Sequence, residues 1–147
     1  PAAPDQLRAL ADTLTATSVE LAWRDTSANE QEFVIRSQPA GSTRWEPVGV
    51  TAANVTTFQV TGLAPSTSYQ FSVCARNRHG VSADSAPVAV STRGLPPNRP
   101  EKLRIENVRP RLLDLAWNDC SNNEHEFLVV CSTNDGPFVP VGLAAKD

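Results

Sequence analysis

The chain has 147 residues, of which 40% are hydrophobic and 20% are charged. This length and composition suit one or two small folded domains and exclude a disordered chain. Thirteen basic and sixteen acidic side chains give a formal net charge of −3, so the charge gives no reason to expect nucleic acid as a partner. No apolar run approaches the roughly 20 residues of a membrane-spanning helix, and membrane insertion is not expected.

In the first part of the chain, short segments alternate apolar with polar residues at a period of two, as half-buried strands require. Clusters of Gly, Pro, Asn and Ser separate these segments. We expect strands around Leu7 and Ala9, at 18–23, at 32–37, around Trp45 and Val48, at 56–60, at 69–75 and at 86–92. Seven short strands in about 95 residues predict an all-β antiparallel sandwich.

The segment RGLPPNRPEKL, residues 93–103, then interrupts the alternation. Its prolines fix φ and favour extended geometry, which indicates a short, semi-rigid connector. We therefore expect one domain at 1–94, a linker at 95–99 and a second domain at 100–147.

A long string recurs in the two domains. The sequence LAWRDTSANEQEF begins at Leu21, and LAWNDCSNNEHEF begins at Leu115, a shift of 94 positions. The second copy follows the first as far as Asp147, which aligns with Asn54. The second domain therefore corresponds to the first half of a sandwich.

Several motifs resemble those of fibronectin type III domains. They are PxxL at Pro4 and Pro100, the tryptophans Trp23 and Trp117, LxPxTxY at 63–69 and AxNxxGxS at 75–82. The resemblance implies an immunoglobulin-like sandwich with seven strands, A to G, in the first domain, and strands A, B, C and C′ in the second. It also implies a tyrosine corner at Tyr69.

The inward positions of these strands predict the core. The expected core residues are Trp23, Phe33, Tyr69 and Phe71 in the first domain, with Trp117 and Phe127 in the second. Half a sandwich leaves such side chains uncovered, at a loss of roughly 1.5 to 3 kcal/mol each. We therefore expect the missing strands to come from the continuation of the same polypeptide or from a neighbouring subunit by strand addition.

The acidic residues of the repeated string allow three interpretations. Asp25, Glu30 and Glu32, with their counterparts Asp119, Glu124 and Glu126, could be catalytic pairs, calcium ligands or loop-shaping residues. A short loop at the rim of a small sandwich favours the third interpretation, in which Asp, Ser and Asn side chains bind nearby backbone amides. The acidic side chains are then expected to point outward. No catalytic residue, cofactor or metal site is predicted.

Other residues give weaker indications. Arg76, Arg78 and His79 lie in a hairpin that could contact a protein partner or form a solvated basic turn. Asn54 begins an N-x-T glycosylation sequence. Cys74 is expected to point outward, where it could form an intermolecular bond. Cys120 and Cys131 are expected to lie too far apart for a disulfide.

The sequence thus predicts a non-enzymatic, extracellular or cell-surface module that acts as a spacer or adhesive repeat, with protein partners or further repeats as neighbours. One alternative is an accessory part of a secreted polysaccharide-degrading hydrolase whose catalytic domain lies elsewhere. Another is a subunit of a filament, in which neighbouring subunits complete each other's second domain.

Overall fold

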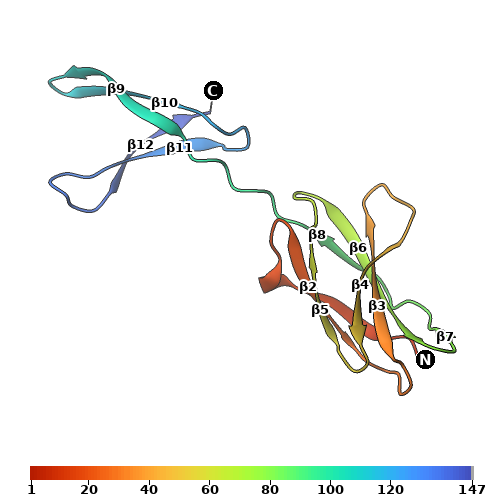
Figure 1. Cartoon of the computed structure of the whole chain (residues 1–147). Coiled ribbons are helices and arrows are strands. Elements are labelled where there is room, and N and C mark those ends of the chain that lie inside the picture. Colours follow the sequence, from red (N-terminus) through yellow and green to blue (C-terminus); the bar gives the residue numbers. More distant parts are fainter. Residues whose placement is uncertain (147) are drawn as a thin grey trace. The chain divides into compact units, whose positions relative to one another are not determined.

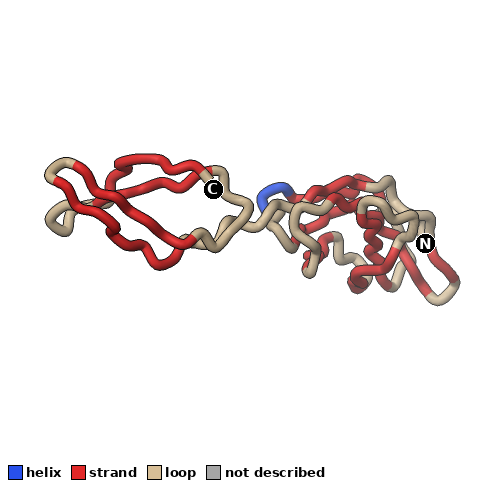
Figure 2. Tube along the Cα trace, turned by 90° about the horizontal axis from the view of Figure 1, so that it is seen from above, coloured by secondary structure: helices blue, strands red, loops and turns tan. Residues whose placement is uncertain are grey.

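The computed structural model describes residues 1–146. It forms two compact units, residues 1–95 and 96–147, which are called unit 1 and unit 2 below (Figure 1). Strands make up the regular structure of the described residues, apart from a single short 3-10 helix, η1, at Ala11–Thr13 (Figure 2).

Unit 1 is a sandwich of two antiparallel sheets. One sheet has the order β1-β2-β5, and in the other β4, β3 and β6 are neighbours, with β7 and β8 both paired to β6. The strands are β1 (Asp5–Leu10), β2 (Ser18–Arg24), β3 (Glu32–Pro39), β4 (Glu46–Ala52), β5 (Thr57–Thr61), β6 (Ser68–Asn77), β7 (Gly80–Val81) and β8 (Val88–Ser91). This arrangement confirms the predicted all-β antiparallel sandwich.

The strand β7 has no counterpart in the prediction, which expected seven strands. Two serines explain the interruption between β7 and β8. The hydroxyl of Ser82 accepts a hydrogen bond from the Ala75 amide at 2.9 Å, and that of Ser85 accepts one from the Val73 amide at 3.1 Å. Both serine amides donate back to the carbonyls of the same residues at 2.8 Å. Side-chain oxygens thus replace backbone carbonyls, and the edge of β6 stays paired without a regular strand.

The core of unit 1 lies between the two sheets and follows the alternation of the sequence. Its largest side chains with under 2% exposure include Phe33, Phe71, Leu21, Ile35, Val19 and Val73. Trp23 is 4% exposed. Tyr69 is partly buried, and its hydroxyl accepts a hydrogen bond from the Ala64 amide at 2.9 Å, as a tyrosine corner does.

The prediction of an accessible Cys74 is wrong, because its side chain is completely buried. Cys74 lies on the outer face of β6 opposite Val34, and its thiol approaches the Val34 carbonyl at 3.9 Å. The ion pair of Arg36 with Asp84, at 3.1 Å, lies beside it. Burial raises the pKa of the Cys74 thiol, which makes the thiol less reactive.

Unit 2 consists of two antiparallel strand pairs. β9 (Glu101–Arg109) pairs with β10 (Leu112–Asn118), and β11 (Glu126–Cys131) pairs with β12 (Val139–Ala145). These pairs match β1 with β2 and β3 with β4 in unit 1. In unit 1 the second edge of β2 is taken by β5 and that of β3 by β6. In the described part of unit 2, the corresponding edges of β10 and β11 carry no strand.

A glycine in β4 tests how closely the two sheets pack. A methyl group added at Gly49 would lie 2.1 Å from Cζ of Phe58, whereas the aligned Gly142 of unit 2 has nothing within 4 Å. We expect Gly49→Ala to lower the free energy of unfolding of unit 1 by about 1 to 3 kcal/mol through overpacking. Urea denaturation of the full chain measures this change, and Gly142→Ala is the matched control. Equal effects of the two substitutions would contradict the packing described.

Candidate functional site

The repeated string forms the loop between β2 and β3 in unit 1 and between β10 and β11 in unit 2. Equivalent hydrogen bonds occur within each of the two loops. Oδ1 of Asp25 accepts from the Ser27 amide at 2.9 Å, and Oδ1 of Asp119 accepts from the Ser121 amide at the same distance. The Ser27 hydroxyl donates to Oδ1 of Asn29 at 3.3 Å. These bonds are the ones that the loop-shaping interpretation predicts.

The same string also closes the base of each loop. Trp23 at the end of β2 meets Phe33 at the start of β3 edge to face, with ring centroids 5.6 Å apart. Trp117 and Phe127 form the same contact at 5.3 Å. Such a pair contributes about 0.5 to 1.5 kcal/mol beyond the burial of its area. The aromatic pair therefore brings the two ends of the loop together in both units.

The expectation that the acidic side chains point outward is wrong for two of them, because Glu30 is 9% exposed and Glu124 is 6% exposed. A hydrogen bond from its own backbone amide holds the pKa of Glu30 below its usual value. The Asn54 amide acts in the same direction, while burial opposes both.

The Glu124 carboxylate has a similar environment in unit 2. Its own backbone amide and the charge of Lys146, whose Nζ lies 3.4 Å from Oε1, lower the pKa of Glu124, again against the effect of burial. Glu32 forms an ion pair with Arg76, and its counterpart Glu126 is exposed. Within residues 1–146, no group of three or more His, Cys, Asp or Glu side chains is arranged to hold a metal ion.

The hairpin between β6 and β7 lies against the repeated loop of unit 1. The Arg78 amide donates to Oε1 of Gln31 at 2.8 Å, and Nδ2 of Asn77 donates to the Asn29 carbonyl at 2.8 Å. Nε of Arg78 donates to Nε2 of His79 at 2.8 Å. Arg78 and His79 are exposed, so their remaining polar atoms face solvent next to the loop.

Asn54 and the two other cysteines are accessible. Asn54 lies exposed in the turn between β4 and β5 with φ of +62°. Cys120 and Cys131 are exposed free thiols, Cys120 in the loop after β10 and Cys131 at the end of β11.

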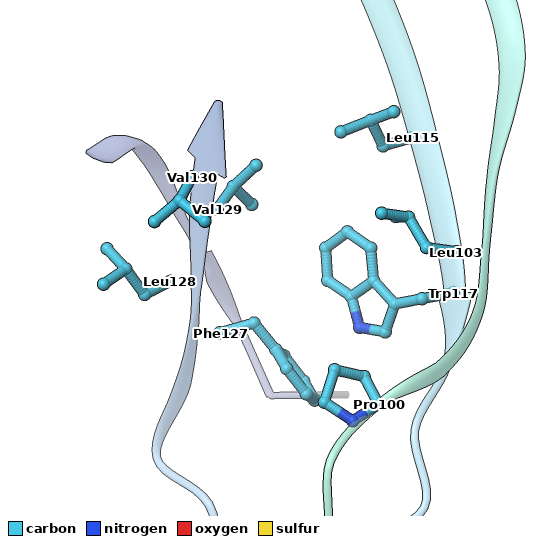
Figure 3. A pocket seen from close by; sticks show the side chains of 8 residues that line it. All are labelled: Pro100, Leu103, Leu115, Trp117, Phe127, Leu128, Val129 and Val130. Carbon is cyan, nitrogen blue, oxygen red and sulfur yellow. The ribbon is translucent and has the colours of Figure 1, made fainter. Parts of the chain in front are cut away.

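Unit 2 has an apolar hollow between its two strand pairs. Leu103, Leu115 and Trp117 come from one side, and Phe127 and Val129 come from the other (Figure 3). The hollow has a volume of about 230 Å³ and also contacts Pro100 and the outer residues of β11.

The residues of this hollow are less buried than their counterparts in unit 1. Leu21 and Phe33 are completely buried, whereas Leu115 and Phe127 are half-buried. Leu103 is 69% exposed. The uncovered side of unit 2, called the open face below, is lined by Leu103, Leu115, Trp117, Phe127 and Val129.

The two sheets and their pairing define unit 1 as an immunoglobulin-like sandwich domain. The family model for the fibronectin type III domain matches residues 2–91, and the chain belongs to this family. Domains of this family are generally non-catalytic structural modules. No helix in the described part of the chain is long and apolar enough to cross a membrane.

The chain is similar to titin from Drosophila melanogaster, with 29% identity over 108 residues. This match covers 69% of the chain and only 1% of titin. A crystal structure of titin domains has 26% identity and a TM-score of 0.57, over 63% of this chain and 32% of that one. A fibronectin domain of Drosophila Lar has 30% identity and a TM-score of 0.51, over 64% of this chain and 98% of that one.

The lowered pKa of Glu30 predicts the pH dependence of unit 1. A carboxylate with a lower pKa in the folded state stabilises the fold above its unfolded pKa, about 4.3, and loses this effect as the pH falls through the folded pKa. We therefore expect Glu30→Gln to flatten the fall in unfolding free energy between about pH 5 and pH 3. The unfolding free energy of unit 1 at each pH is measured by urea denaturation, followed through the methyl NMR signals of its core.

The exposed Glu46 provides a control for this experiment, because Glu46→Gln removes one charge at a surface position. If the unfolding free energy of Glu30→Gln falls with decreasing pH in parallel with that of the native chain, the buried carboxylate contributes nothing to the acid sensitivity of unit 1.

Proposed function

We propose that the chain is a structural and interaction module built from tandem fibronectin type III repeats, with unit 2 as the first half of a second repeat. The observation that carries this proposal is the recurrence in unit 2 of the strand pairs, loop bonds and aromatic contact of unit 1. Prolines 96 and 97, at the start of unit 2, suit a spacer of limited flexibility.

We further propose an extracellular or cell-surface location, as a spacer or adhesive repeat. Fibronectin type III domains are common in such proteins. The exposed Asn54 in its N-x-T sequence fits this location, because a glycan attached there would extend into solvent. The proposed role as an accessory part of a secreted hydrolase has no specific support in the two units.

Arg78 and His79, beside the ion-paired Arg76, are the proposed contact point for a protein partner. Backbone and side-chain bonds to the repeated loop hold this hairpin in place, so contact by a partner would require little ordering of it.

The open face of unit 2 is proposed to receive antiparallel strands equivalent to β5 and β6, whether they come from the continuation of the polypeptide or from a neighbouring subunit. In unit 1 these strands supply Phe58 above Gly49 and Phe71 and Val73 opposite β3. Unit 2 keeps the matching glycine, Gly142, with open space above it. Burial of the open face would contribute roughly 1.5 to 3 kcal/mol for each large apolar side chain.

Charge supports one further property of the proposed incoming strand. Glu32 at the start of β3 lies opposite Arg76 of β6 and forms an ion pair with it. Glu126 holds the same position at the start of β11, is exposed and has no ion pair within residues 1–146. A strand that pairs with β11 in the register of β6 would place a basic residue opposite Glu126.

A peptide with the sequence of residues 56–78, which contains β5 and β6, tests this proposal when titrated into the full chain. We expect it to shift the amide NMR signals of β10 and β11. Gly142→Ala in the chain is expected to weaken binding at least about five-fold, because the added methyl group would meet the incoming phenylalanine.

Two controls accompany the titration. A peptide with Arg76→Glu is expected to bind more weakly, and a scrambled peptide is expected to leave both strands unchanged. The strand-acceptor proposal fails if the native peptide shifts neither β10 nor β11, or if the scrambled peptide shifts them equally.

A further inference from the structure

The serine of the repeated string has a second contact, with the chain that enters each unit. The Ala2 amide donates to Oγ of Ser27 at 3.3 Å. The Asn98 amide donates to Oγ of Ser121 at 3.1 Å. Ala2 and Asn98 each lie two residues before the proline of the PxxL motif, at Pro4 and Pro100, so the two hydrogen bonds join equivalent positions.

A second bond supports the first in each unit, although the atoms differ. In unit 1 the Thr26 hydroxyl donates to the Ala3 carbonyl at 2.6 Å. In unit 2 the position of Thr26 is taken by Cys120, whose carbonyl accepts from Nδ2 of Asn98 at 2.9 Å. The two bonds join different positions, but in both units a second hydrogen bond links the entering chain to the residue before the serine.

From this geometry we infer that the repeated loop of each unit is a binding site for the backbone of the peptide that enters that unit. Ser27 and Ser121 are the residues that recognise it. Each serine hydroxyl donates its hydrogen to an asparagine, Asn29 or Asn123, so that its lone pair faces the entering amide. The Asp25 and Asp119 carboxylates fix the serine backbone from the other side.

The composition of the connector agrees with this role. Prolines stand at 96, 97 and 100, but the position that donates to Ser121 is Asn98, which has a backbone N–H. A backbone amide is the same in every non-proline residue, so this site accepts entering peptides of different sequence. In unit 2 the site attaches the last part of the 95–99 linker to the receiving domain, which shortens the segment able to flex. This role does not depend on what covers the open face.

Ser121→Ala in the full chain tests the inference, because it removes the acceptor and leaves the loop backbone unchanged. We expect the Asn98 amide proton to exchange about 3- to 10-fold faster, as the loss of one net hydrogen bond implies. The ¹⁵N heteronuclear NOE of residue 98 is expected to fall toward the value of a mobile linker. Ser121→Thr, which keeps a hydroxyl, is expected to retain the native exchange rate.

Ser132→Ala is the matched control, because it removes a hydroxyl from another loop of unit 2, where Ser132 donates to the Gly136 carbonyl. Unchanged exchange in Ser121→Ala, or equal acceleration in Ser132→Ala, would overturn the inference. If Ser121→Ala unfolds unit 2, the test moves to Ser27→Ala in unit 1, where the NOE of Ala2 must fall. An unchanged NOE there would also overturn the inference.

Discussion

The edge-to-face contact between a tryptophan and a phenylalanine is the interaction on which both units depend. Trp23 lies near the end of β2 and Phe33 lies near the start of β3, and the two strands belong to different sheets. Their contact therefore joins the layers of the sandwich at the point where the chain crosses between them. The loop that makes this crossing has its two ends fixed, and its polar side chains can take defined positions at the rim.

The backbone pattern of unit 1 could be predicted from the sequence because each inward side chain belongs to a strand with a period of two. Leu21, Phe33 and Phe71 are buried as that period requires. The break between β7 and β8 could not be predicted in this way, since the hydroxyls of Ser82 and Ser85 take the place of backbone acceptors there. Serine in a polar segment gives no signal of that role by itself.

The burial of Cys74 and of Glu30 could not be predicted from the sequence either. Period two assigns Cys74 to the outer face correctly, but the Arg36–Asp84 ion pair beside the thiol joins groups that are distant in sequence. Glu30 turns inward because the Asn54 amide and the Ser27 hydroxyl lie beside its carboxylate. Recurrence of a glutamate at position 124 was not a sufficient signal, because Glu126 also recurs, at the position of Glu32, and is exposed.

The polar residues of the repeated string can now be assigned separate tasks. The aspartate fixes the turn, the serine faces the entering chain, the asparagine orients the serine, and the glutamate fills the interior of the loop. Each of these contacts is made within a single unit. The same set of contacts can therefore form in every repeat of the proposed tandem array, whatever partner is bound. The proposed contacts with partners involve segments outside the repeated string, such as the Arg78 hairpin, and the open face of unit 2.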